Sequence, residues 1–541
     1  MAEGVIIMGS NLTLHDYERV ALFNDLVVLD EAAGNRVTEN RKSLELAVEN
    51  GSVIYGVNSG FGPMCNRIIP SQSIEELQLN LIRSHCSGHG EPLSKEIVRG
   101  CMLLRANSLA RGFSGARREV IEILIAFLNY DIYPLIPERG SVGASGDLVH
   151  LAHLALTLIG EGKIWWSGEW CNSYEVLNEL GIKPLKPAFK EGLSLINGTS
   201  MTTSLGCYAV IQAKKLARLS QANVAMCLEV LGGTTEAFSP ELHSVKSHWG
   251  QKMVAETVEK HVRDSDLTRH NEVVFKTLRE DHEKETLLTS YVSIQDAYSL
   301  RCVPQILGPV VETIEFVESI LEREFNSTSD NPVIIDSPGG VSVFHGGHFH
   351  AQYCSMALDY LSIAIAEMGV LAERQINRLT NDKLNGDLPP FLIPKDHGLR
   401  CGLMGVQYLA ASTTAELQSL STPISIHSIS TNADNQDIVS MGPSSALRSL
   451  AQVERVCRIF AIQLLCLAQG LDLRDIKKAS KQTQHIYGFI RDKYPSIVED
   501  RPMYTAIAEL VTIIKGPEFN CLLEKINEDA EDIPASSDDG N

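Results

Sequence analysis

The stretch Gly140-Ser141-Val142-Gly143-Ala144-Ser145-Gly146-Asp147-Leu148 organises the rest of this 541-residue chain. Three glycines within seven residues stand directly before an apolar pattern with spacings of three and four, which is typical of one helix face. Asp147 falls where a carboxylate is favoured at the start of a helix. The pattern predicts a glycine-rich loop that leads into a helix N-terminus. Because a Gly-Lys-Ser/Thr ending is missing, it is not a phosphate loop.

Long apolar patterns predict helices over much of the remaining chain. The clearest covers residues 303–325, where Val303, Leu307, Val310, Ile314, Val317 and Leu321 alternate spacings of four and three. Similar patterns occupy roughly 351–379, 401–421 and 444–472. We therefore predict a mainly α fold, in which a long central helical bundle adjoins a smaller N-terminal domain that carries the glycine-rich loop. The expected divisions are residues 1–200, residues 201–527 and an acidic disordered tail over 528–541.

Composition restricts the possible partners and the compartment. The 47 basic and 67 acidic residues give a net charge of −20, which argues against binding to nucleic acid or to an anionic membrane. The N-terminus has no signal-peptide pattern, and no uncharged apolar run approaches the ~18 residues of a membrane span. The 12 cysteines are scattered without a Cys-x-x-Cys pair, as expected for free thiols of a reduced, cytoplasmic protein.

Two other kinds of catalytic site find little support. The pair His150/His153 and the cluster His345, His348 and His350 have suggestive spacing, but no convincing carboxylate or cysteine completes a metal site, so we expect none. A Ser-His-Asp hydrolase is disfavoured because no Gly-x-Ser-x-Gly elbow follows a strand. By residue type alone, His85 is better interpreted as a structural histidine.

The triad Ala144-Ser145-Gly146, in its surroundings, resembles the self-processing triad of the aromatic amino acid ammonia-lyases and 2,3-aminomutases. In that family the triad cyclises with loss of water to 4-methylidene-imidazol-5-one (MIO), an electrophile that no ordinary side chain supplies. The residue types suit this chemistry, because Gly146 lacks a Cβ and Ser145 can lose its hydroxyl. The resemblance implies an autocatalytic MIO and no metal or diffusible cofactor.

Further segments, in order over about residues 50–475, extend the resemblance. The glycine-rich loop around Tyr55 corresponds to the loop of the general-base tyrosine, although a surface turn is an equally good interpretation of the loop alone. Leu195-Ile196-Asn197-Gly198-Thr199 resembles a signature that sets Asn197 beside the MIO. The segment 295–302 corresponds to one that supplies a second tyrosine, Tyr298, and an arginine, Arg301, whose planar fork suits a substrate carboxylate.

Three more segments complete the implied site. Residues 326–332 resemble a loop before the returning helix, and Gly347-His348-Phe349-His350 resembles a motif that sets Phe349 against the MIO. His348 stands where many members have Asn. Residues 435–441 resemble the segment that places an amide or carboxylate, here Gln436, near the substrate amine. The resemblance also implies a homotetramer whose active sites combine residues from three chains.

A few pocket residues imply the substrate. Histidine ammonia-lyases carry Glu at the position of Gln436, and phenylalanine ammonia-lyases carry an apolar pair at the position of Ser84-His85. Tyrosine-using members often have His at position 85, and certain tyrosine aminomutases add a tyrosine that matches Tyr408. Both side chains can bond a phenol hydroxyl, and a site built to do so rejects the analogue that lacks it. The chain is therefore most similar to bacterial tyrosine ammonia-lyases and tyrosine aminomutases, although Ser-His also occurs in histidine lyases.

The implied reaction is the non-oxidative deamination of L-tyrosine to trans-p-coumarate and ammonia. Tyr55 would remove the β-proton as a phenolate, for which we expect its pKa to lie below the usual value near 10. The alternatives are a tyrosine or phenylalanine 2,3-aminomutase, a histidine or phenylalanine ammonia-lyase, and an inactive helical scaffold.

Overall fold

The computed structural model describes residues 4–269, 276, 293–337 and 340–531. These residues form mostly helices, together with four small sheets of two or three strands, so the predicted mainly α class is confirmed. The chain divides into two compact units. The first comprises Met1–Ile211, Phe316–Tyr360 and Thr422–Leu450, and the second comprises Gln212–Glu315, Leu361–Ser421 and Ala451–Asn541.

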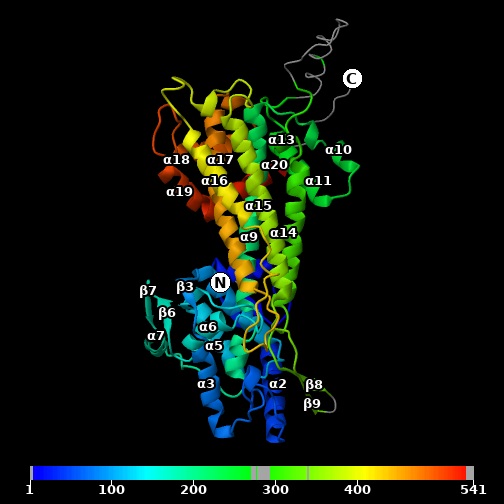
Figure 1. Ribbon diagram of the computed structural model, residues 1–541, viewed down its shortest axis with the longest axis vertical. Helices are drawn as coiled ribbons and strands as arrows, with labels where there is room; N and C mark the ends of the chain where they lie inside the picture. Colours follow the sequence, from blue (N-terminus) through cyan, green and yellow to red (C-terminus); the bar gives the residue numbers. More distant parts are fainter. Residues whose placement is uncertain (1–3, 270–275, 277–292, 338–339, 532–541) are drawn as a thin grey trace. The chain divides into compact units, whose positions relative to one another are not determined.

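The first unit contains many short elements, several of which support the loops described below (Figure 1). Its helices are α1 (Leu14–Ala21), α2 (Glu31–Glu49), α3 (Ile74–His85), α4 (Lys95–Ala110), α5 (Arg118–Asn129), α6 (Leu148–Leu158), α7 (Ser173–Glu179) and α8 (Glu191–Ile196). Its strands are β1 (Val5–Ile7), β2 (Val27–Leu29), β3 (His89–Pro92), β4 (Tyr133–Pro134), β5 (Pro137–Arg139), β6 (Lys163–Trp166), β7 (Glu169–Asn172), β8 (Val333–Ser337) and β9 (Gly340–Phe344). β1 and β2 pair in parallel, whereas the sheets β3-β5, β4-β6-β7 and β8-β9 are antiparallel.

The second unit is built from helices. It contains α10 (Pro240–Ser244), α11 (Trp249–Val262), α13 (Tyr298–Arg301), α16 (Met404–Ser419), α18 (Lys481–Lys493), α19 (Tyr504–Lys515) and α20 (Pro517–Glu531). Four long helices contribute residues to both units, namely α9 (Ser200–Leu231), α14 (Val303–Phe325), α15 (Gln352–Thr380) and α17 (Gly442–Leu471). This division differs from the expected boundary after residue 200, because each long helix carries the chain from one unit into the other. Residues 528–531 of the expected tail belong to α20, and residues 532–541 lie outside the described residues.

The apolar seam predicted over residues 303–325 is the buried face of α14. Each of its six residues is at most 3% exposed. Hydrophobic periodicity was sufficient to predict this buried face, because a long helix between other helices must bury one continuous apolar stripe. α15 is the one described helix long and apolar enough to cross a bilayer, and 72% of its most apolar stretch is buried inside the protein.

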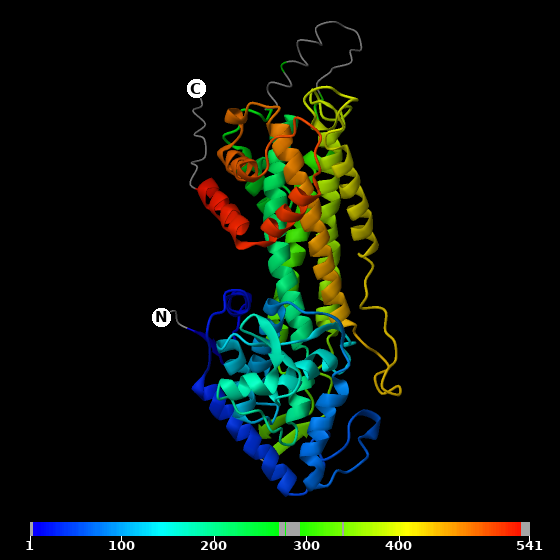
Figure 2. The ribbon, with the colours of Figure 1, turned by 90° about the vertical axis from the view of Figure 1, so that its left-hand side faces the viewer.

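The long helices α9, α15 and α17 lie side by side in the second unit (Figure 1, Figure 2), and a chain of buried amides joins them. Asn223 Nδ2 of α9 donates to Gln463 Oε1 of α17 at 2.8 Å, and Gln463 Nε2 donates to Gln375 Oε1 of α15 at 2.6 Å. Gln375 Nε2 then donates to the Ser299 carbonyl of α13 at 2.8 Å. The short helix that carries Tyr298 and Arg301 is therefore held by polar contacts from the core.

Replacing Gln463 by alanine should destabilise the protein, because it leaves buried polar atoms of Asn223 and Gln375 without partners. An unsatisfied buried polar group costs about 1–3 kcal/mol. We expect the midpoint of urea unfolding to fall clearly for Gln463→Ala. The control Gln418→Ala, at an exposed position of α16, should leave the midpoint within error. Equal midpoints for the two variants would contradict a structural role of the amide chain.

Candidate active site

The glycine-rich loop before α6 has a backbone that only glycine tolerates. Gly143 and Gly146 have φ angles of 70° and 78°, in the left-handed region. A Cβ added to Gly146 would lie 2.3 Å from the amide nitrogen of Gly198, so the two backbones touch directly. The Asp147 amide also donates to the Gly198 carbonyl at 2.7 Å. The loop therefore packs against the turn that follows α8.

Two amide side chains that are far apart in the sequence both form hydrogen bonds to Ser145. Asn197, the C-cap of α8, donates from Nδ2 to the Ser145 carbonyl at 2.6 Å. Gln436 donates from Nε2 to Ser145 Oγ at 2.7 Å. Gln436 is oriented in turn by Thr431, whose hydroxyl donates to Gln436 Oε1 at 3.1 Å. The structure thus brings together the triad and two of the residues that the resemblance implied.

The turn that carries Phe349 is tied to the same loops. The Ala351 amide and the Ser440 hydroxyl both donate to the Gly143 carbonyl, at 3.1 and 2.8 Å. His350 Nε2 donates to the Ile438 carbonyl at 3.2 Å. These bonds join residues 347–351, which include Phe349, and residues 438–440 to the start of the triad.

Tyr55 lies on a loop that the core anchors on both sides. Ile54 and Val57 are buried in one cluster with residues of α2 and β8. The Gly62 amide donates to the Tyr55 oxygen at 3.0 Å, and the ring of His345 lies edge-on at 6.4 Å. Burial raises the pKa of Tyr55 above its ordinary value, and the bond from Gly62 lowers it by less. The expected depression of this pKa is therefore wrong for the chain as described, because desolvation outweighs the hydrogen bond.

Gln78 is a supporting residue that the sequence did not reveal. It is fully buried on α3, donates from Nε2 to the Gly56 carbonyl at 3.1 Å and accepts from the Leu193 amide at 3.2 Å. Gly56 has a φ of 68°, and a Cβ there would lie 2.4 Å from Leu193 Cδ2. One side chain thereby fixes the loop of Tyr55 to both α3 and α8.

His85 ends α3 and is half-buried. Its Nδ1 lies 2.9 Å from the Leu81 carbonyl, which can only accept, so Nδ1 carries the proton. In the neutral ring Nε2 is then an acceptor. His85 can therefore receive a hydrogen bond from a hydroxyl group.

Three further residues implied by the resemblance belong to the second unit. Arg301 lies over the ring of Tyr298, with Cζ 4.6 Å from the ring centroid, and Nε donates to the Asp296 carbonyl at 2.9 Å. Tyr298 is exposed, as is Tyr408 on α16. The amide chain from Gln375 supports this segment through Ser299.

Charged residues lie buried behind Asn197, and the sequence analysis did not identify them. Lys190 Nζ pairs with Asp330 Oδ2 at 2.9 Å, and both side chains are inaccessible to solvent. Arg105 Nη1 donates to the Asn197 carbonyl at 3.3 Å, whereas its Nε and Nη2 have no hydrogen-bond partner among the described residues. Burial lowers the pKa of Arg105 and of Lys190, and Asp330 partly offsets this effect.

Asp147 is a buried carboxylate at the N-cap of α6. It accepts bonds from the Thr202 amide and hydroxyl at 2.7 and 2.6 Å. Burial raises the pKa of Asp147 to about 6 in spite of these bonds. The carboxylate thus connects the loop of the triad to the first turn of α9.

No group of three or more His, Cys, Asp or Glu side chains in the described part of the chain could hold a metal ion. All 12 cysteines are free thiols.

The triad Ala144-Ser145-Gly146, held by two side-chain amides within a mainly α fold, is the arrangement expected of an aromatic amino acid lyase. A family model described as aromatic amino acid lyase matches residues 12–492, and the chain belongs to this family. It is 42% identical over 518 residues to a tyrosine 2,3-aminomutase of Chondromyces crocatus, covering 96% of this chain and 97% of that protein. It is 41% identical to a histidine ammonia-lyase of Caldanaerobacter subterraneus, covering 96% and 98%. A solved tyrosine aminomutase of Streptomyces globisporus superposes with a TM-score of 0.93 at 35% identity, covering 98% of this chain and all of the other.

The raised pKa of Asp147 predicts a pH dependence of stability. Its ordinary value is 3.8, so between about pH 4 and pH 6 the folded protein binds a proton that the unfolded chain does not. The contribution of this group to stability is greatest below pH 4 and is lost as the pH rises to 6, by up to about 3 kcal/mol. The near-isosteric Asp147→Asn variant lacks this dependence. Relative to the variant, the wild type should lose stability from pH 4 to pH 6, so its unfolding midpoint should fall against that of the variant. Above pH 6 the difference between the two midpoints should stay constant. A difference that is constant over the whole pH range would contradict the prediction.

Proposed function

We propose that this chain catalyses the non-oxidative deamination of L-tyrosine to trans-p-coumarate and ammonia. The observation that carries the proposal is the pair of amide donors on Ser145, one on its carbonyl and one on its hydroxyl oxygen. A donor on the carbonyl acidifies the Cα proton, and a donor on Oγ assists departure of the hydroxyl. Asn197 and Gln436 therefore support the dehydration that a serine in this triad has to undergo.

The residues at the triad fit an MIO group formed from Ala144-Ser145-Gly146. The left-handed Gly146, which has no room for a Cβ, is suited to ring closure through its own amide nitrogen. Once formed, the group supplies an electrophilic methylidene that accepts the substrate amine and makes it a better leaving group. Asn197 remains as the donor on the former Ser145 carbonyl.

The other side chains have separate roles in the proposed mechanism. Tyr55 takes the β-proton on its phenol oxygen, which already accepts one bond from Gly62. It must first lose its own proton, a step that burial opposes. Arg301 binds the substrate carboxylate through its planar guanidinium, and Tyr298 assists in proton transfer. Phe349 packs against the triad.

The preference for tyrosine rests on His85 and Gln436. The proton on His85 Nδ1 leaves Nε2 as an acceptor for a phenol hydroxyl, and Tyr408 is the second candidate partner of that hydroxyl. Gln436 is neutral, whereas an imidazole substrate is better served by a carboxylate. A tyrosine 2,3-aminomutase is the second candidate, because a relative that is 42% identical has that name. We further propose that the protein is a cytoplasmic homotetramer that binds neither nucleic acid nor membrane.

Product identification tests the proposal directly. Purified protein with an equimolar mixture of L-tyrosine, L-phenylalanine and L-histidine should yield p-coumarate and ammonia as the main products, resolved by chromatography and mass spectrometry. Tyr55→Phe should lower the rate at least ~100-fold, since a general base typically contributes 10²–10⁴-fold. Ser145→Ala should abolish both the reaction and the mass loss of the peptide that contains residues 144–146.

Each other product would replace the proposal with a defined alternative. β-Tyrosine as the main product indicates an aminomutase, and urocanate indicates a histidine ammonia-lyase. Cinnamate alone removes the role of His85 in hydroxyl binding. An unmodified triad peptide in the wild type indicates an inactive scaffold.

Replacing His85 by phenylalanine should change the substrate preference. It removes the acceptor for the phenol hydroxyl, so kcat/KM for tyrosine should fall relative to that for phenylalanine by at least about 10-fold, the equivalent of roughly 1.4 kcal/mol. His89→Phe, at an exposed histidine four residues away, is the matched control and should leave the ratio unchanged. An unchanged ratio in His85→Phe would exclude hydroxyl recognition by this residue.

A further inference from the structure

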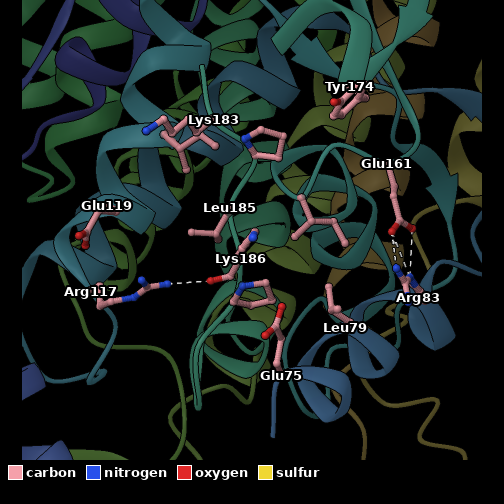
Figure 3. A pocket seen from close by; sticks show the side chains of 14 residues that line it. Glu75, Leu79, Arg83, Arg117, Glu119, Glu161, Tyr174, Lys183, Leu185 and Lys186 are labelled. Atoms are coloured by element: carbon pink, nitrogen blue, oxygen red, sulfur yellow. Dashed lines mark hydrogen bonds and ion pairs between the residues drawn. The ribbon is translucent and has the colours of Figure 1, made fainter. Parts of the chain in front are cut away.

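A cavity of about 670 Å³ lies within the first unit, apart from the triad (Figure 3). Its walls come from α3, the start of α5, the turn after α6 and the segment 183–187 before α8. The volume lies in the range of small-molecule sites, roughly 300–1,000 Å³. None of the roles proposed above uses this cavity.

Two ion pairs hold the walls of the cavity in place. Arg83 of α3 pairs with Glu161 at 2.5 Å, which joins α3 to the turn after α6 (Figure 3). Arg117 pairs with the buried Glu191 at 2.7 Å and donates from Nη2 to the Lys186 carbonyl at 2.8 Å. Glu191 is buried whereas the side chains of Arg83 and Glu161 are both accessible to solvent, so the Arg117–Glu191 pair is the firmer support of the cavity wall.

The other residues that line the cavity include both positively and negatively charged side chains as well as apolar ones. Leu79, Ile123 and Leu185 supply apolar walls. Four exposed charged side chains, Lys183, Lys186, Glu75 and Glu119, also line the cavity, and none of them forms an ion pair within the described part of the chain. Figure 3 shows Leu185, Lys186 and Glu75 along the middle of the cavity. A ligand that matches this lining has an apolar body, one carboxylate and one ammonium group.

The helices around the cavity are those that carry the candidate active site. α3 contributes Leu79 to the cavity, holds the Tyr55 loop through the adjacent Gln78 and ends at His85. α6 begins after the triad and ends in the cavity wall, whereas α8 begins at the Arg117 ion pair and ends before Asn197. α3, α6 and α8 pack against one another in all three combinations.

We propose that this cavity is a second ligand site, which binds an α-amino acid with an apolar side chain. Lys186 binds its carboxylate, Glu75 binds its ammonium group, and Leu79 and Leu185 contact its side chain. Occupancy stiffens α3 and α8, which carry the supports of Tyr55 and Asn197.

Equilibrium dialysis with L-phenylalanine tests the site. The full-length Ser145→Ala protein is used because it should bind amino acids without converting them. We expect one molecule per chain, bound in the cavity, because the site at the triad is proposed to reject an amino acid without a phenol hydroxyl. A second substitution, Lys186→Glu, should weaken this binding at least 10-fold, whereas the matched control Lys163→Glu, at an exposed lysine outside the cavity, should leave it unchanged. Binding that is wholly insensitive to Lys186→Glu would overturn the proposal. A second molecule whose binding does not depend on Lys186 would count against the selectivity proposed for the triad and not against the cavity, so the two proposals fail separately.

Two further probes test the ligand class. Phenethylamine and 3-phenylpropionate each lack one charged group and should bind at least 10-fold more weakly than L-phenylalanine at the Lys186-dependent site. Equal binding of either probe would overturn the assignment to an amino acid. Hydrogen–deuterium exchange should slow in residues 74–85 and 191–197 on addition of L-phenylalanine, and this slowing should disappear in Lys186→Glu. Slowing confined to residues 183–187 would overturn the stiffening of α3 and α8.

Discussion

The direct contact between the backbones of Gly146 and Gly198 is the constraint on which the first unit depends. Neither position has room for a Cβ, since one on Gly146 would lie 2.3 Å from Gly198 and one on Gly198 would lie 1.8 Å from Arg105 Nη1. The triad, the turn after α8 and the buried guanidinium are therefore stacked in three layers. This stacking brings Asn197 within 2.6 Å of the Ser145 carbonyl, and everything proposed for the triad follows from it.

Tyr55 and the triad lie on loops, and each of these two loops is fixed by a buried polar side chain. Gln78 of α3 holds the Tyr55 loop, and Asp147 holds the triad to α9 through Thr202. Such supports hold the backbone of each loop in one conformation, because the surrounding bonds over-determine it. The cavity beside α3 matters for the same reason, since a ligand bound there would contact the helix that supports the Tyr55 loop.

The sequence predicted what depends on local pattern and failed where distant partners decide. The α14 seam was predicted from spacing. The triad, Asn197 and Gln436 were implied by motifs, and in the structure both amides bond Ser145, whereas their roles in the reaction stay predictions. Gln78 was missed because a glutamine in an amphipathic helix is normally exposed, and its partners lie 22 and 115 residues away. The rise in the pKa of Tyr55 was missed for a related reason, since burial comes from tertiary packing and leaves no trace in the loop sequence.

The buried charges behind Asn197 are best understood as part of the site rather than of the core. Arg105 leaves two nitrogens without described partners, and each unsatisfied buried group costs about 1–3 kcal/mol. An apolar residue of similar volume would avoid that cost, as replacements of buried ion pairs generally do. Arg105 instead bonds the Asn197 carbonyl and lies against Gly198, so its side chain supports the turn that carries Asn197. The free-energy cost of burying Arg105, Lys190 and Asp330 thus accompanies an arrangement that holds the Asn197 side-chain amide rigidly against Ser145.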